Sequence, residues 1–269
     1  MTATTASLRR SVLGLGEIAR HRELYLTLVE RQLRLRAKRA VFGIVWPFCA
    51  PLFLFALYRY VFSSVFQVSI EHYGVYLFCG LLPWTFLVQA VHDSLQSISF
   101  EPDLVRRAPM PYQLLPLSRV TAMALPFLVL LVAFVAVVAG TDVPLDLALL
   151  PVLTLPVAST LLLVAGLAML LALVDVFNRD LRYVLHNLLT VWFFLVPIVY
   201  HPRMTSDLVR QVSSLDPVRH VVAGYRDVLW AGAVDDPLRH VLTLLGCAAF
   251  FLASLAVFRR GAVDLAKDV

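Results

Sequence analysis

VTAMALPFLVLLVAFVAVVA, residues 120–139, is a run with no charged side chain and a single polar one, Thr121. A helix of about 20 apolar residues crosses the hydrocarbon core of a bilayer, so this stretch predicts a transmembrane helix. With this run extended to residue 117, the apolar segments of the chain are 41–66, 76–91, 117–139, 145–174, 183–200 and 241–258. We therefore expect an all-α membrane protein with six spans, in a transmembrane domain over residues 41–258.

The overall composition also indicates a membrane protein. Hydrophobic residues make up 60% of the 269 residues and charged residues 15%, whereas soluble proteins contain roughly 45–50% apolar and about 25% charged residues. The net charge is +5, but the basic residues cluster beside the apolar runs instead of covering a polar face. This placement argues against a nucleic-acid partner.

No nucleotide or metal site is expected on this chain. Its two lysines, Lys38 and Lys267, each follow alanine, whereas a phosphate-binding GxxxxGK(S/T) loop requires a glycine before the lysine. Cys49, Cys79 and Cys247 lie far apart within apolar segments, without the spacing of a zinc site or a disulfide framework.

The distribution of arginine and lysine predicts the orientation, because positively charged loops stay in the cytoplasm. Nine basic residues lie in 1–40, three in 97–119, two in 175–182 and three in 259–269, against none in 67–73 and 140–144 and four in 201–236. Both termini, an N-terminal region over 1–40 and a tail over 259–269, are therefore expected in the cytoplasm.

Residues 17–39 have the periodicity of an amphipathic helix. The apolar side comprises Ile18, Leu24, Tyr25, Leu28, Val29 and Leu35, and the polar side Arg20, Glu23, Glu30, Arg31, Arg34 and Lys38. A basic helix of this kind is expected to lie along the cytoplasmic membrane interface. The alternative is an ordinary soluble helix packed on a partner.

Two connections are expected to contain helices. Residues 100–108 have acids first and arginines last, followed by Pro109 and Pro111, which is typical of a short cytoplasmic helix; a capped loop is the alternative. In the external loop 201–236, Asp216 and Pro217 provide an N-cap and a first helical residue, and apolar residues then recur at helical spacing.

Five sequence blocks, in order, resemble those of the type 2 ATP-binding-cassette permeases that export polysaccharides such as O-antigen and teichoic acid. They are RQLRLR (31–36) with FGIVWP (42–47), GLLPWTF (80–86), LVRRAPMP (104–111) with LLPLS (114–118), NRDL (178–181) with PIVY (197–200), and LDP (215–217) with YR (225–226). Asp216 stands where the family usually has asparagine, and Met110 where it usually has phenylalanine. Both departures leave details of docking open.

The resemblance implies a permease subunit in a bacterial inner membrane, not an enzyme. It would form a homodimer with two copies of a separate ATPase, which would bind ATP and Mg²⁺, and would export a lipid-linked polysaccharide of O-antigen, galactan or teichoic-acid type. The helix over 100–108 would couple the two subunits. Its expected contact residues are Glu101, Asp103, Leu104, Arg106, Arg107 and Met110.

Basic and aromatic residues are candidates for handling such a cargo. The lipid pyrophosphate is expected to meet Arg34, Arg36, Lys38 and Arg39, since guanidinium groups match phosphate oxygens; anchoring to anionic membrane lipids is the alternative. The glycan channel is expected to be lined by Tyr58, Tyr60, Tyr76, Trp84, Trp192 and Phe194. Taken one by one, these residues are better explained by aromatic belts at the two membrane interfaces.

Arg59, within the first apolar segment, is the clearest intramembrane charge. It would contact the cargo in transit, pair with Glu71 or Asp93, or extend to the membrane surface. Asp175, Arg179 and Asp180 are interpreted as a capped cytoplasmic turn.

Two other functions remain open. A related permease for a drug or small lipid would differ only in substrate. A membrane-embedded glycosyltransferase would need clustered acids or histidines, but the acids are scattered and the histidines lack HExxH spacing.

Overall fold

A computed structural model describes residues 20–39, 46–65, 70–99, 110–178, 180–201 and 206–268, and these residues contain helices but no strand. The α-helices are α3 (Arg22–Arg39), α4 (Trp46–Tyr60), α5 (Tyr73–Leu95), α7 (Leu114–Ala139), α8 (Thr154–Phe177), α9 (Leu181–Leu195), α10 (Asp207–Ser214), α11 (Pro217–Leu229) and α12 (Pro237–Asp268). A π-helix, Val61–Val65, continues α4, and a 3₁₀-helix, Leu147–Leu153, leads into α8.

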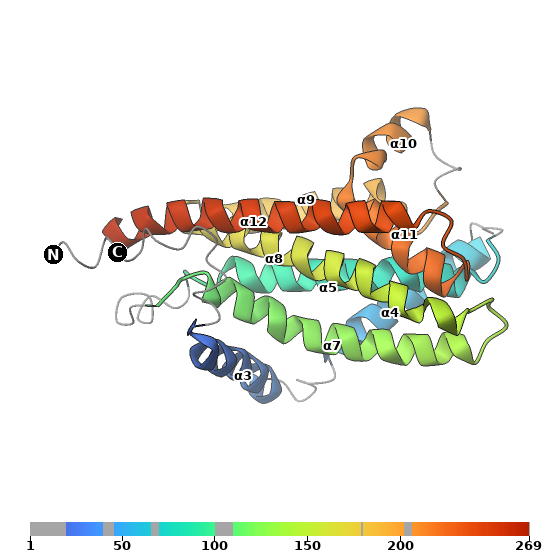
Figure 1. Cartoon of the computed structure of the whole chain (residues 1–269), viewed down its shortest axis with the longest axis horizontal. Helices are drawn as coiled ribbons and strands as arrows, with labels where there is room; N and C mark the ends of the chain where they lie inside the picture. The colour runs from blue at the N-terminus through green and yellow to red at the C-terminus, as the bar shows by residue number, and fades with distance from the viewer. Residues whose placement is uncertain are drawn as a thin grey trace.

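The long helices α5, α7, α8 and α12 run side by side along the long axis of the molecule (Figure 1). Helix α5 lies at the centre: 78% of its 18-residue apolar stretch is buried inside the protein, whereas only 28% of the corresponding stretch of α12 is buried. At one end of the bundle, called the α3 end, lie α3, the C-terminal end of α5 and the N-terminal end of α7; the opposite end carries α11 (Figure 1).

In the part of the chain that the structure describes, four helical segments are long and apolar enough to cross a membrane: Tyr73–Leu95, Leu114–Ala139, Leu147–Phe177 and Pro237–Gly261. The chain is thus a multi-pass membrane protein, as predicted. The other two predicted spans correspond to shorter helices. Helix α9 has 15 residues, and α4 has 15 followed by the five-residue π-helix.

The amphipathic helix predicted over 17–39 is observed from Arg22, and it packs against α7. Leu28 is 4% exposed, and the hydroxyl of Tyr25 contacts that of Thr121. Arg34, on the polar side, keeps 71% of its side chain exposed. The polar and apolar sides are therefore oriented as the sequence predicted.

The loop predicted to be helical contains α10 and α11, with the predicted cap. The carboxylate of Asp216 accepts a hydrogen bond of 2.8 Å from the backbone N–H of Val218, and Pro217 is the first residue of α11. The second predicted helical connection, 100–108, lies outside the described residues.

Candidate functional site

A buried carboxylate holds three segments together at the α3 end. Asp175, in the last turn of α8, is fully buried. Arg182, in the first turn of α9, donates hydrogen bonds of 2.6 and 2.7 Å to its two carboxylate oxygens, and the hydroxyl of Ser99 donates another of 2.7 Å. We call Asp175, Arg182 and Ser99 the aspartate node.

The node stands next to the predicted coupling segment, because Ser99 directly precedes residues 100–108. Asp175 was expected to belong to a capped turn, but it forms a buried ion pair instead. The turn itself is capped by the Asn178 side chain, which accepts a hydrogen bond of 3.1 Å from the backbone of Asp180; Arg179 lies outside the described residues. A helix break separates Asp175 from Arg182, so neither helical nor strand periodicity could have paired them.

Among the residues expected to form the coupling helix, Glu101, Asp103, Leu104, Arg106 and Arg107 lie outside the described part. Met110 is described and is only 7% exposed, within the hydrophobic core of the chain itself.

The basic residues of α3 have different surroundings. Arg34 pairs with Glu30 one turn earlier and is largely exposed. Arg36 is half-buried and donates to Asp93 of α5. The side chains of Lys38 and Arg39, in the last turn of α3, lie outside the described part.

The aromatic candidates fall into buried and exposed groups. Tyr58 of α4 stacks on Phe193 at 5.4 Å between ring centroids, and Trp84 of α5 packs edge-on against Trp192 of α9 at 5.6 Å. These contacts join α4, α5 and α9. Tyr60 and Phe194 are 66% and 57% exposed, whereas Tyr76 and Trp84 are 1% and 6% exposed.

Arg59 lies in the last turn of α4, and its side chain reaches α5. Its guanidinium occupies the space beside Gly74, where an added Cβ would lie 2.8 Å from Nη1. One of the two acids considered as its partner, Asp93, pairs with Arg36 instead.

A second buried charge lies at the α11 end, where the sequence suggested only a family motif. Arg226 is 7% exposed, and its guanidinium carbon lies 3.6 Å from the centroid of the Tyr76 ring. It donates to the backbone carbonyls of Tyr76, Pro197 and Ile198, at 3.3, 2.7 and 2.7 Å. Gly80 permits this approach, since an added Cβ would lie 3.3 Å from Nη2 of Arg226.

Burial changes the acid–base properties of α11. It lowers the pKa of Arg226, an effect that nearby tyrosine and cysteine side chains oppose. Burial also raises the pKa of Asp216, although the Trp192 and Val218 N–H groups that it accepts from favour its charged form. Arg226 and Asp216 are thus buried polar groups whose hydrogen bonds hold α11 against α5, α9 and the segment after α9.

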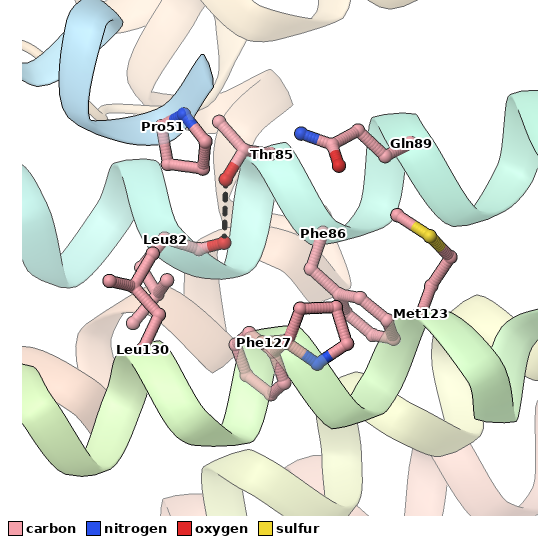
Figure 2. Close-up of a pocket in the computed structure, with 9 residues that line it drawn as sticks. Pro51, Leu82, Thr85, Phe86, Gln89, Met123, Phe127 and Leu130 are labelled. Carbon is pink, nitrogen blue, oxygen red and sulfur yellow. Dashed lines mark hydrogen bonds between the residues drawn. The ribbon is translucent and has the colours of Figure 1, made fainter. Parts of the chain in front are cut away.

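A small crevice between α4, α5 and α7 is too narrow for cargo (Figure 2). Its volume is about 20 Å³, close to the space that one water requires. Phe86 and Phe127 stack in its wall at 4.7 Å, and Thr85 donates to the carbonyl of Leu82. Within the described ranges, no group of three or more acidic, cysteine or histidine side chains is placed to hold a metal ion.

Comparison with known proteins matches residues 23–230 to the family described as ABC-2 type transporter. The O-antigen export system permease protein RfbA of Myxococcus xanthus is 28% identical over 228 residues, which cover 82% of this chain and 85% of that protein. Two Klebsiella pneumoniae proteins of the same name are each 22% identical over 238 residues, covering 88% of this chain and 92% of the relative.

Proposed function

Because the chain belongs to the ABC-2 type transporter family, we propose that it is the permease that carries lipid-linked polysaccharide across the bacterial inner membrane. The observation that supports this most strongly is the relation to an O-antigen export permease over more than four-fifths of both chains. The cargo is of O-antigen, galactan or teichoic-acid type, and it moves from the cytoplasm to the outer face.

The energy comes from a separate subunit. Membership of the family implies an ATP-binding partner, and two copies of it bind ATP and Mg²⁺ beneath a dimer of this chain. The segment 100–108, with Glu101, Asp103, Leu104, Arg106 and Arg107, meets that partner. The aspartate node supports this role, because it ties the start of the segment to α8 and α9 through hydrogen bonds of 2.6–2.7 Å.

Six spans with both termini in the cytoplasm fit the charge distribution. The α3 end then faces the cytoplasm and the α11 end faces outward, with α4 and α9 completing the four long apolar segments. Helix α3 lies along the inner surface of the membrane.

The lipid pyrophosphate meets the basic end of α3. Arg34 has a largely exposed side chain and offers a forked donor to phosphate oxygens, while Arg36, Lys38 and Arg39 extend the positive charge toward the first span. The exposed rings of Tyr60 and Phe194 line the path of the glycan. Behind these two rings, the wall of the path is supported by four further aromatic residues, Tyr58, Tyr76, Trp84 and Trp192. Arg59 lies beside this wall.

Helix α9 forms the contact between two copies. His186, Asn187 and Thr190 are exposed on it, whereas the exposed face of α12 is apolar, with Val241, Leu242, Leu245, Leu252 and Val257. Polar side chains at membrane depth usually face protein or water instead of lipid. This difference favours α9 over α12 as the side that meets the partner copy and the channel.

The proposed function is tested by depleting the protein in the cells that make it. Lipid-linked glycan is expected to accumulate on the inner side of the membrane, and mass spectrometry of the accumulated lipid identifies the sugar. Depletion of the ATPase subunit, as the matched control, is expected to give the same lipid. Absence of any accumulated glycolipid would contradict polysaccharide export and favour the small-lipid or drug alternative.

A further inference from the structure

One face of α11 is polar, although the helix is largely buried. Val218, Val221, Val222, Tyr225 and Val228 form its buried apolar face. On another face, Arg219, Ala223, Arg226, Asp227 and Trp230 follow one another at helical spacing, and all of them line a single cavity. The cavity is completed by Tyr76, Pro197, His201, His220 and Arg239.

This cavity, which we call the α11 cavity, has a volume of about 230 Å³. Every lining side chain is buried or half-buried, so the walls are already formed. Trp230 is fixed by a hydrogen bond of 2.9 Å from its indole N–H to the carbonyl of Glu71, and Tyr76 by one of 2.8 Å from its hydroxyl to the carbonyl of Tyr200.

Positive charge exceeds negative charge in the lining. The cavity contains three arginines, Arg219, Arg226 and Arg239, but one carboxylate, Asp227. Asp227 pairs with Arg239 and lies 3.2 Å from Nε2 of His240.

The guanidinium groups of Arg219 and Arg226 donate their hydrogen bonds to neutral oxygens instead of a carboxylate. Arg219 donates to the carbonyl of Arg210 and the hydroxyl of Ser213, within the field of Asp216 on the same helix. In the described ranges, Arg226 is held by carbonyl oxygens without an acidic ion-pair partner.

One lining donor also lacks an acceptor. The Nε of Arg239 is buried and has no hydrogen-bond partner within the described part of the chain. A buried N–H without an acceptor is costly, so the pair with Asp227 does not satisfy all the donors of Arg239. Together with the excess of guanidinium groups, this donor indicates a site for an anion.

We propose that the α11 cavity binds a diphosphate group, that of the lipid-linked cargo as it reaches the outer face. The inference rests on the proposed function for the identity of the cargo, and on the cavity for the site. Arginine pairs with phosphate oxygens through two parallel hydrogen bonds, and three arginines match the several charges of a diphosphate. The half-buried Trp230 ring offers a flat surface to the adjoining sugar.

The size of the cavity limits its ligand. Pockets for drug-sized molecules measure about 300–1,000 Å³, so a cavity of 230 Å³ suits a compact headgroup and excludes a chain of several sugars. The site therefore recognises the constant part of the cargo and not its repeating glycan.

The test places a thiol in the cavity. Ala223→Cys is introduced with Cys49, Cys79 and Cys247 replaced by alanine, and the permease with its ATPase subunit is held nucleotide-free in phosphatidylcholine nanodiscs. The rate of labelling by a neutral maleimide is measured against the concentration of inorganic pyrophosphate or of undecaprenyl diphosphate. Both ligands are expected to slow labelling, and their concentration dependence gives Kd.

Variants that remove a positive or a negative charge from the cavity are expected to shift Kd in opposite directions. Arg219→Gln and Arg239→Gln each remove a charged donor and are expected to raise Kd roughly tenfold. Asp227→Asn removes the only lining carboxylate and is expected to lower Kd. Arg260→Gln, an exposed change on α12 outside the cavity, is the matched control and is expected to leave Kd unchanged.

Each contrary outcome has a defined meaning. Protection by inorganic pyrophosphate alone would overturn the assignment to a lipid headgroup, and protection by neither ligand would overturn the site. An equal Kd for Asp227→Asn and Arg239→Gln would also overturn it, and this comparison remains informative if Arg219→Gln fails to fold. Since the assay involves no transport, a negative result leaves the export function to be judged by the accumulated glycolipid.

Discussion

Asp175 is a charge removed from water in the interior of a helical bundle. Its carboxylate is fully buried, and three donated hydrogen bonds of 2.6–2.7 Å compensate for the lost hydration. A buried pair of this kind contributes little net stability when intact, but breaking it is costly because one charge is left uncompensated. The node therefore fixes geometry at the junction of α8, α9 and Ser99 more than it adds stability.

The two partners are not equivalent, which gives a prediction. Arg182→Ala leaves a buried carboxylate with Ser99 alone, whereas Asp175→Ala leaves a guanidinium that is 23% exposed and reaches water. We expect Arg182→Ala to lower the free energy of unfolding by about 2–3 kcal/mol, somewhat below the range for fully buried pairs, and Asp175→Ala to cost less.

Thermal unfolding in detergent measures these differences. The double variant Asp175→Ala/Arg182→Ala is expected to be more stable than Arg182→Ala alone, because no buried charge remains. Additive losses in the double variant would show that the two side chains act independently.

At the scale of single residues, the sequence predicted what depends on near neighbours. Asp216 was recognised as an N-cap because its acceptor bond to Val218 lies two residues away. The Asp175–Arg182 pair and the three carbonyl acceptors of Arg226 depend on how distant segments meet. Local patterns carry no information on such contacts.

At the scale of helices, the sequence predicted where each helix lies along the chain better than it predicted the residues at which each helix begins and ends. The run 145–174 was expected to be one helix, but its first turns form the 3₁₀-helix Leu147–Leu153, which contains Pro151, a residue without a backbone N–H. Helix α9 ends at Leu195, two residues before Pro197, although the apolar run continues. Helix α12 extends past its apolar part to Asp268, because polar residues also continue a helix.

Helices α8 and α12 meet at a glycine. A Cβ on Gly166 would lie 2.8 Å from Cε1 of Phe250 and 3.2 Å from Oγ of Ser254. Gly166→Leu is therefore expected to lower the stability of the bundle by about 1–3 kcal/mol through overpacking. The shift in thermal unfolding temperature checks this.

Gly246, on α12, supplies the matched control. No atom lies within 4 Å of a Cβ added there, and leucine has a higher helix propensity than glycine. Gly246→Leu is expected to leave the unfolding temperature unchanged or slightly higher. An equal loss for both variants would contradict close packing at Gly166 as the cause.

The coupling segment is tested as an element. Asp103→Arg, or deletion of residues 101–107, is expected to separate ATP hydrolysis from export, because the segment passes movement of the ATPase to the spans. ATP hydrolysis and glycolipid export are measured together on the assembled complex. Normal export by either variant would refute the coupling role of this segment.

For the whole molecule, the two exposed helix faces make different predictions. A single cysteine replacing Val191 on α9, in a chain without Cys49, Cys79 and Cys247, is expected to form a disulfide between two copies under mild oxidation. Val257→Cys on α12, also at an exposed position, is expected to form no disulfide between the two copies. Equal cross-linking at both positions would contradict α9 as the specific contact.

The arrangement of charge and apolar surface was available from the sequence, because a membrane imposes it on every span. The sequence also showed that the chain lacks a phosphate-binding loop. The α11 cavity was not predictable, since its lining comes from α5, the segment after α9, α11 and α12, and only the folded bundle brings these together.

The central claim is that this chain moves a lipid-linked polysaccharide with energy taken from another polypeptide. The most direct measurement reconstitutes the chain with its ATPase subunit in proteoliposomes carrying the glycolipid on the ATPase side, and follows its appearance on the opposite side with an impermeant glycan-cleaving enzyme. We predict that the glycolipid appears there only when both polypeptides and ATP are present. Appearance at the same rate without ATP, or without the ATPase subunit, would contradict the claim.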